Sequence, residues 1–398
     1  MSAHTRTINI DSGVFKWLFN TSGCTKKEIS EKTGINSEKW NLYLESEEPI
    51  PLTLGTINTL ANIYHRPITA FLIPEAPKDS DIPKDFRRNT KTGEYSKKLH
   101  RTFNKARRSL KLYIEMMENI GEEIPEIPSC SINDNPEEIA ERERERLGIS
   151  HLEISRNKDE AYKQWRAHLT ENGIPVLQYN MDEDDVRGFI IRYGGASAIA
   201  VNSGDADRGR IFTIFHEYAH ILLGTNSVCT DDGEVSEDAD INKIEHWCDH
   251  FAGAFLIPKT AVTEDIRIRD LINSGHYAKA AEKLSTNCTV SKAAALVRLR
   301  VLGIIPKDAG ETELREWRHA GRAKKSAVKT KDEEDEENTK KTGGPDAAVL
   351  SVAELGASYV TLASKNYEKG HITYAGYLNT IGISKNSHER LRKKGVIE

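Results

Sequence analysis

The sequence predicts a mainly α-helical protein with one small β-sheet, an α+β fold. In the middle of the chain, residues 212–224 and 244–258 carry apolar side chains at helical spacing. Two short segments before them, 187–192 and 198–202, have the pattern of strands. The segment 25–67 instead alternates helical stretches with turn residues. We therefore expect an all-α domain near the N-terminus, followed by a larger domain in which helices pack on a small sheet.

A His-Glu-x-x-His motif lies inside the first of the two central helices, at His216, Glu217 and His220. Side chains four residues apart lie on one face of a helix, so both imidazoles can reach one metal ion with Glu217 beside them. The apolar residues around the motif predict burial: Ile211, Ile214, Phe215, Ala219, Leu222 and Leu223. Burying two imidazoles and a carboxylate without partners is costly, and metal ligation removes that cost. The motif predicts half of a zinc hydrolase site; the alternative is a pair of structural histidines held by hydrogen bonds.

Catalytic zinc usually takes three protein ligands, so a third ligand should lie downstream. In the second central helix, Glu245 and Asp249 are four residues apart and share one face. We assign Glu245 as the third ligand and Asp249 as the carboxylate that holds one metal-bound imidazole in its tautomer. The rival ligands are His246, His250 and Cys248. Cys248 lies toward the apolar side, where a small core residue is expected, and a partly exposed polar face accounts for both histidines.

These residues resemble the ImmA/IrrE family of metallo-endopeptidases. The similar segments are the run from Arg210 to His220, then Glu245-x-x-Cys-Asp-x-Phe-Ala252, and Phe255-Leu-Ile-Pro258. The resemblance implies a zincin-like metallopeptidase domain, with the two motif histidines and Glu245 on the metal and Glu217 as general base. It also implies that the substrate is a helix-turn-helix repressor of a phage, mobile-element or stress circuit. The family usually has Ala-Asn where this chain has Cys248-Asp249, so the role of Asp249 rests on its spacing alone.

The resemblance extends to both sides of the motif. Residues 161–177 look like the helix and first strand of the family, and residues 289–303 look like its closing helices. A helix-turn-helix is possible at 289–303, but a packing role fits that segment better.

The metal set implies peptide hydrolysis by a zinc-activated water. Glu217 takes a proton from that water and later passes it to the leaving amine. Tyr218, His250 and Arg210 are candidates for stabilising the oxyanion. Mn²⁺ or Fe²⁺ can replace Zn²⁺ in such a set, because two histidines and one glutamate leave positions that other divalent ions also occupy.

The N-terminal segment predicts a helix-turn-helix. A first helix from Thr25 ends at Gly34, and a second helix follows with Ser37 as its N-cap. The pattern resembles the Xre/Cro type of DNA-binding domain, which often precedes the peptidase in this family. Residues 1–70 hold seven Lys or Arg and seven Asp or Glu, and three glutamates just after the second helix weaken phosphate binding. Lys39 is the candidate DNA contact, and docking of the repressor substrate is the alternative role.

Positive charge concentrates in the next segment. Residues 78–112 contain twelve Lys or Arg and four Asp or Glu. A helix is expected to begin within this segment. Its apolar stripe packs it on the rest of the protein and consists of Leu99, Phe103, Ala106, Leu110 and Ile114. The other face of this helix carries Arg101, Lys105 and Arg108, which can bind the phosphates of nucleic acid. A solvated helix that links two domains explains the same charges equally well.

Composition limits the remaining functional classes. A net charge of −5 over 398 residues excludes a globally polyanion-binding surface. Five cysteines without CxxC pairs indicate a reducing compartment. No apolar run is long enough to span a bilayer, so we expect a cytoplasmic protein without membrane contact.

The composition shifts predict five segments along the chain. They are a helix-turn-helix domain at 1–77, a basic linker helix and joint at 78–135, a metallopeptidase domain with closing helices at 136–318, a disordered charged tether at 319–345 and a small helical domain at 346–398. The expected function is a zinc-dependent endopeptidase in transcriptional regulation whose partner is a repressor-type protein. The alternative is a DNA-binding regulator or antitoxin-like protein with a non-catalytic metal site.

Overall fold

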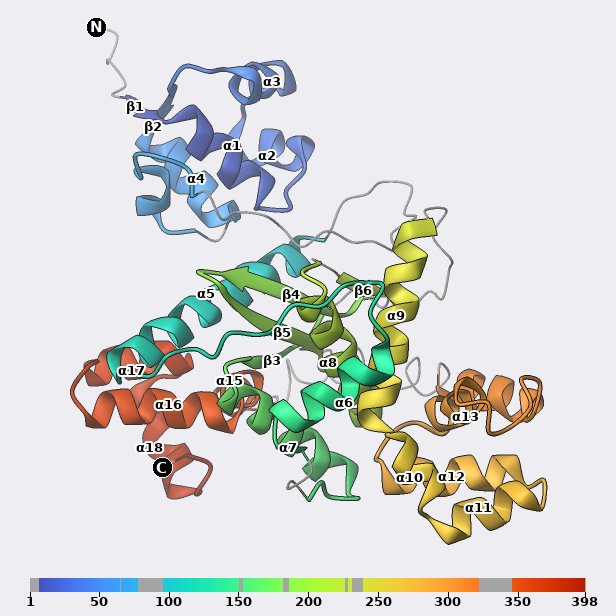
Figure 1. The fold of residues 1–398 in the computed structure, drawn as a ribbon. Helices are drawn as coiled ribbons and strands as arrows, with labels where there is room; N and C mark the ends of the chain where they lie inside the picture. Colours follow the sequence, from blue (N-terminus) through green and yellow to red (C-terminus); the bar gives the residue numbers. More distant parts are fainter. Residues whose placement is uncertain are drawn as a thin grey trace, which may run out of the picture. The chain divides into compact units, whose positions relative to one another are not determined.

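The computed structural model describes residues 7–64, 66–77, 96–149, 153–181, 186–225, 228–230, 239–321 and 346–397. These residues form two compact units (Figure 1). The first contains residues up to 77 and the beginning of helix α5 as far as Lys105, and the second contains the chain from Ala106 onward. Both units are mainly helical with small sheets, which confirms the predicted fold class.

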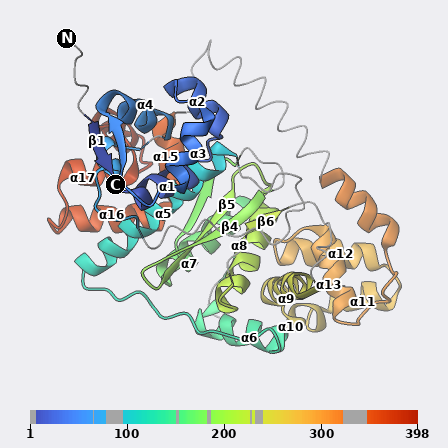
Figure 2. The same ribbon diagram turned by 90° about the horizontal axis from the view of Figure 1, so that it is seen from above.

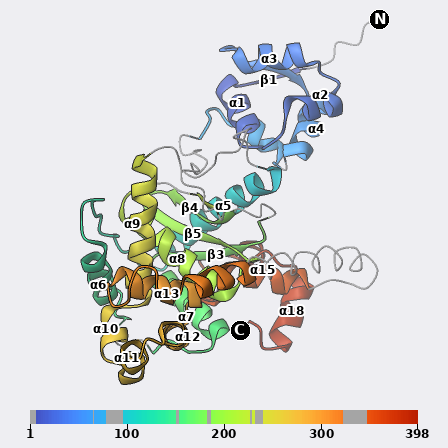
Figure 3. The ribbon, with the colours of Figure 1, turned by 90° about the vertical axis from the view of Figure 1, so that its right-hand side faces the viewer.

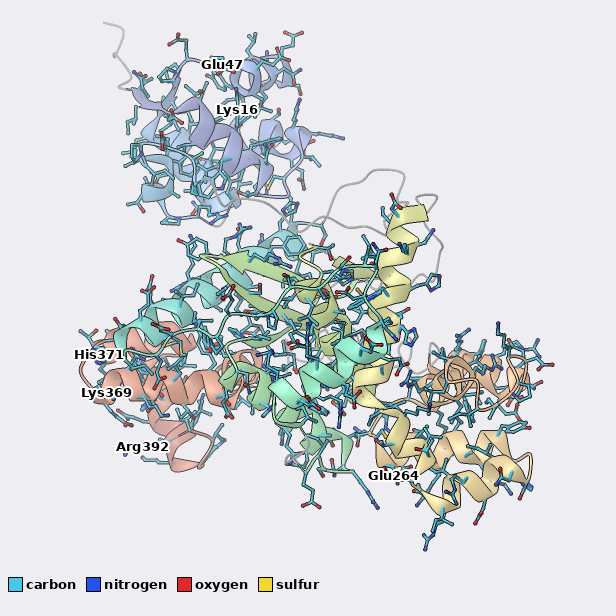
Figure 4. All side chains as sticks on the ribbon, viewed as in Figure 1. Lys16, Glu47, Glu264, Lys369, His371 and Arg392 are labelled. Atoms are coloured by element: carbon cyan, nitrogen blue, oxygen red, sulfur yellow. The ribbon has the colours of Figure 1, made fainter. Side chains whose placement is uncertain are left out.

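The first unit is a helical cluster with one short strand pair. Its elements are β1 (Thr7–Ile10), α1 (Ser12–Asn20), α2 (Lys26–Thr33), α3 (Ser37–Glu45), β2 (Ile50–Thr53), α4 (Leu54–Tyr64), the 3-10 helix η1 (Ile68–Phe71) and the start of α5 (Lys97–Asn119). Phe15 of α1 stacks on Trp40 of α3 with ring centroids 5.2 Å apart, and both side chains are buried. At the surface, Lys16 lies beside Glu47, 3.2 Å from its carboxylate (Figure 4).

Two details of the first unit differ from the prediction. The unit is not purely helical, because β1 and β2 pair antiparallel with Thr7 opposite Thr53. Ile50 and Leu52 are buried whereas Pro51 between them is exposed, a two-residue alternation too short to stand out in the sequence. The N-cap of α3 is Asn36 rather than Ser37, because the Asn36 side chain accepts the backbone N–H of Lys39.

A four-stranded sheet forms the centre of the second unit. The strands are β3 (Val176–Tyr179), β4 (Val186–Tyr193), β5 (Ala196–Asn202) and β6 (Val228–Thr230), in the order β3-β5-β4-β6. Strands β3 and β5 are parallel, and the other two pairs are antiparallel. Gly194 and Gly195 join β4 to β5 with φ of +56° and +81°, the left-handed conformation of a two-residue hairpin turn. The predicted strands are present, and β6 was not predicted.

Helices cover the sheet and extend from it. They are α6 (Pro136–Arg146), α7 (Lys158–Glu171), α8 (Asp207–Leu222), α9 (Ala239–Leu256), α10 (Lys259–Thr263), α11 (Ile266–Asn273), α12 (Tyr277–Asn287) and α13 (Lys292–Val301). Helix α8 lies between the sheet and α9 (Figure 2). Phe215 of α8 stacks on Phe255 of α9 at 4.3 Å and meets Trp165 of α7 edge-on at 4.8 Å. These buried rings fix α8 in the middle of the apolar core.

Four helices complete the second unit: α15 (Ala347–Leu355), α16 (Ala357–Glu368), α17 (Tyr374–Ile381) and α18 (Lys385–Lys393). The last of them, α18, is drawn in red in Figure 3. Helix α16 packs against the later part of α5, where Tyr359 donates a hydrogen bond to the carbonyl of Ser109 at 2.9 Å. The apolar stripe predicted for α5 is buried as far as Leu110, but Tyr113 and Met116 take the place of the half-buried Ile114.

The predicted tether at 319–345 lies outside the described residues, apart from 319–321, which are helical. Among the described helices, none is by itself both long and apolar enough to cross a membrane, and one bent pair, α15 with α16, passes that test by length and composition only.

Candidate metal centre

Helix α8 places the two motif histidines on one buried face. The Nε2 atoms of His216 and His220 are 3.2 Å apart, and both side chains are almost fully buried. The four-residue spacing predicts this arrangement, because it brings the two imidazoles to adjacent turns on the same side of the helix.

Helix α9 brings the carboxylate of Glu245 to the same point. Glu245 Oε2 lies 3.2 Å from His216 Nε2, and Oε1 lies 3.4 Å from His220 Nε2. With ligand bonds of about 2.0–2.2 Å, two ligands of a tetrahedral ion lie roughly 3.3–3.5 Å apart. The three separations here, 3.2, 3.2 and 3.4 Å, fit that geometry closely. The donor set of two imidazoles and one carboxylate also suits zinc and other divalent ions.

The other ring nitrogen of each histidine is held from outside the set. Asp249 Oδ1 lies 2.8 Å from His216 Nδ1, which is the contact that the helical spacing of Glu245 and Asp249 suggested. Thr225 Oγ1 lies 2.9 Å from His220 Nδ1. Thr225 was not foreseen, although Gly224 before it has φ of +69° and ends the helix in a turn that brings Thr225 back. Both contacts leave Nε2 turned toward the shared point.

Electrostatics favour a cation at this point. Burial tends to raise the pKa of Glu245, but contacts with His216 and His220 outweigh burial and hold that pKa far below its ordinary value. Burial tends to lower the pKa of His216, but its contacts with Asp249 and Glu245 raise it to about 10. The two carboxylates thus supply negative charge that a metal ion would neutralise.

Glu217 is fully buried beside the ligand set, and Gly188 of β4 makes room for it. A Cβ atom at position 188 would lie 3.3 Å from Glu217 Oε1, 2.7 Å from Thr213 Cγ2 and 2.9 Å from the carbonyl oxygen of Ala200. The register of β4 against β6 shifts between Val186 and Gly188. Gly188 therefore belongs to the site. No sequence pattern predicts it, because the need for glycine arises from contacts with two other elements.

The rival ligands lie elsewhere. His246 is exposed, and His250 Nε2 is 2.6 Å from Glu137 of α6. Cys248 is fully buried in the apolar core, and burial raises the pKa of its thiol well above the ordinary value. Among the described residues, Cys248 is not part of the set whose ligand atoms converge on one point, and its burial suits a small core residue.

The three oxyanion candidates are engaged in other contacts. His250 binds Glu137, and Tyr218 donates to Glu143 Oε2 at 2.6 Å. Arg210 donates to Gln178 at 2.6 Å. Arg210 also lines a cavity of about 900 Å³ between α7, the start of α8 and the C-terminal helices, and no residue of the metal set lines that cavity. None of these side chains is directed to the metal set by its contacts.

Helix α6 contacts both ligand-bearing helices through charged groups. Arg146 donates to Glu143 Oε2 at 2.6 Å and to the Tyr218 hydroxyl of α8 at 2.5 Å. Arg144 donates to the carbonyl of Phe255 in α9 at 2.6 Å. The charged side chains of α6 alternate in sign along the sequence, a pattern that usually marks a solvated face.

The four nucleic-acid candidates are all exposed. Lys39 on α3 lies over the ring of Tyr43, with its Nζ 5.6 Å from the ring centroid. Arg108 donates to Asn379 of α17 at 3.0 Å. Arg101 and Lys105 belong to the first unit and Arg108 to the second. Nucleic-acid binding by these four residues stays a prediction.

One family model matches part of the chain. Residues 169–300 match Peptidase_M78, described as the IrrE N-terminal-like domain. No curated protein matches the chain at a significant level. The matched segment runs from the end of α7 into α13 and includes every residue of the metal set. The match therefore supports a metallopeptidase of the ImmA/IrrE group over this part of the chain.

Proposed function

We propose that this protein is a zinc-dependent endopeptidase that cleaves a regulatory protein of the helix-turn-helix repressor type. The observation that carries the catalytic part is the convergence of His216, His220 and Glu245 within 4.8 Å, with the buried Glu217 next to them. Three protein ligands leave a tetrahedral ion one further position, which distinguishes a catalytic site from a closed structural one. Mn²⁺ or Fe²⁺ suits the same ligands.

The residues of the site divide the work of peptide hydrolysis. A divalent ion held by the three ligands supplies Lewis-acid polarisation of a peptide carbonyl and of water. Glu217 accepts a proton from the attacking water and then delivers it to the nitrogen of the leaving amine. Asp249 and Thr225 hold the two imidazoles in the tautomer that exposes Nε2. Packing of Phe215 against Trp165 of α7 and Phe255 of α9 fixes the position of α8.

The resemblance to the ImmA/IrrE group supports a repressor as the substrate. The first unit contains two short helices, α2 and α3, joined by a turn at Gly34, as in helix-turn-helix proteins. The outer residues of α3 include Glu38 and Glu45 beside Lys39. This mixed charge suits docking of a protein substrate better than binding of phosphates.

The test is Glu217→Gln in the zinc-loaded full-length protein. The probe is a library of peptides that tile helix-turn-helix proteins, with cleavage followed by mass spectrometry. We expect zinc content to stay within about twofold and cleavage to fall by about 10²–10⁴-fold, the usual contribution of a general base. Glu264→Gln, a change at a distant exposed residue (Figure 4), is the matched control and should cleave normally. Equal cleavage by Glu217→Gln and the wild type would refute the assignment.

A further inference from the structure

Two helix pairs at opposite ends of the chain are built by the same rules. In the first, α2 has eight residues, is capped by Thr25 and ends at Gly34 with φ of +72°. In the second, α17 has eight residues, is capped by Thr373 and ends at Gly382 with φ of +70°. In each pair the glycine is followed by an isoleucine, then by an N-cap residue, Asn36 or Ser384.

The second helices, α3 and α18, have nine residues each. Both pairs therefore have the helix, three-residue glycine turn and second helix of a helix-turn-helix unit.

A third pair, α12 and α13, differs from these two because its second helix is buried. Ala295, Leu296 and Leu299 of α13 belong to the main core. Arg298 of α13 is also buried, and it donates to the carbonyl of Ile257 and to Glu137. A helix enclosed in this way cannot enter a groove of DNA, so this pair has a packing role.

The outward faces of α3 and α18 carry opposite charge. Helix α3 bears two glutamates and one lysine. Helix α18 bears one glutamate against Lys385, Arg390, Arg392 and Lys393, and Lys394 follows it directly. All five basic residues are exposed. Positive charge on the second helix is what the negative phosphates of DNA require.

Contacts on the inner side of α18 fix its basic side outward. His388 and Leu391 are buried, and His388 Nδ1 lies 3.1 Å from the hydroxyl of Tyr374 on α17. Arg390 pairs with Asp346 at 2.5 Å. Within the described residues, Lys385 and Lys393 form no ion pair, and Arg392 projects outward from α18 (Figure 4).

The turn between α17 and α18 is held on α15. Ser351 of α15 donates to the carbonyl of Ile381 at 2.9 Å. A Cβ atom at Gly382 would lie 2.5 Å from Ser351 Oγ, and the φ of +70° also requires glycine there. These contacts hold the turn between α17 and α18 in one conformation before a ligand binds, which keeps the entropy lost on binding small.

We propose that α17 and α18 form a site for double-stranded DNA, with α18 as the helix that enters the major groove. Lys385 and Asn386 lie at the N-terminal end of α18, where such a helix meets base edges. Arg392 and Lys393 near its other end contact phosphates. This assignment places DNA binding in the second unit, beside the peptidase, and does not depend on catalysis.

The experiment compares two double charge reversals in the full-length protein. Lys385→Glu with Lys393→Glu alters α18, and Lys27→Glu with Lys39→Glu alters the exposed lysines of α2 and α3 by the same charge. The probe is a labelled duplex of about 30 base pairs with random sequence, three helical turns long, followed by fluorescence anisotropy at several salt concentrations. The α18 reversal should weaken binding at low salt by at least about tenfold and reduce the slope of log K against log salt by about two.

The control reversal and a second variant make the outcome decisive. The α2–α3 reversal tests the rival candidate Lys39 directly and, if α18 is the DNA-binding helix, should bind DNA like the wild type. Lys385→Gln with Lys393→Gln removes the same contacts without adding repulsion, and unchanged metal content shows that the second unit is folded. Equal loss in both reversals, loss in the α2–α3 reversal alone, or binding to anionic vesicles but not to duplex would overturn the proposal.

Discussion

The ligand-bearing helices α8 and α9 and the exposed helices α3 and α18 acquire their roles in different ways. At the metal centre, each of the three ligand side chains is held by a contact from outside its own helix. In α3 and α18 the backbone follows the same plan, and the side chains on the outer faces differ in charge. A buried site is thus specified by packing, whereas an exposed helix is specified by its surface charge.

This difference determines whether a substitution should change the free energy of folding or only the binding of a ligand. A change within the metal centre leaves a buried polar group without its partner, which costs free energy in folding or in metal binding. A change on the outer face of α18 leaves the fold intact and alters only what binds there.

Glu245→Ala should reduce zinc affinity by more than about 100-fold, since it removes one of three ligands and the charge that attracts the cation. Asp249→Ala should cost less, about 10–100-fold, because Asp249 acts through the orientation of His216. Competition with a zinc chelator measures both. If Asp249→Ala proved the more damaging of the two, the ligand assignment would be wrong.

Glu143→Gln should destabilise the second unit by about 3–5 kcal/mol, because Glu143 is fully buried and pairs with Arg146. Tyr218→Phe removes one hydrogen bond to the same carboxylate and should cost about 1–2 kcal/mol. Asn386→Ala on the exposed face of α18 is the control and should stay within about 0.5 kcal/mol. Urea denaturation measures the three free energies of unfolding; similar values would contradict the contrast between buried and exposed helices.

The parts of this protein that could be predicted are those in which one helix carries the whole signal. His216, Glu217 and His220 lie within five residues, and the apolar spacing of α9 gives Glu245 and Asp249 a common face. Gly188 could not be predicted, because its role arises where β4 meets α8. The same holds for Glu143. The alternating charges of its helix suggest a solvent-exposed face, and its buried contact with Tyr218 is evident only in the structure.

The basic residues of α18 are evident in the sequence, but the sequence alone predicts no function for them. The segment was expected only to be helical. The likeness to α2–α3 becomes clear when the left-handed glycines and the capping residues are compared in the structure. The likeness between the N-terminal and C-terminal helix pairs therefore lies in local turn geometry rather than in composition.

Glu137 is intermediate between the buried and the exposed charged groups, because its side chain is one-third exposed. Burial tends to raise its pKa, but hydrogen bonds from Arg298 and His250 lower it from 4.5 to about 2. Because the pKa is lower in the folded state, the stabilisation is complete above about pH 4.5 and is lost as the pH falls toward about 2. Glu137→Gln should therefore cost about 1–2 kcal/mol at pH 7, after allowance for screening by water, and almost nothing near pH 2.

The measurement is the free energy of unfolding of Glu137→Gln and the wild type at several pH values. A difference that stayed constant with pH would mean that Glu137 acts by shape rather than by charge. A difference that disappears at low pH would mean that its charge joins α6 to α9 and α13, through His250 and Arg298. In that case the charge of a partly exposed carboxylate is governed by its partners, as at the buried groups, in contrast to the exposed basic residues of α18.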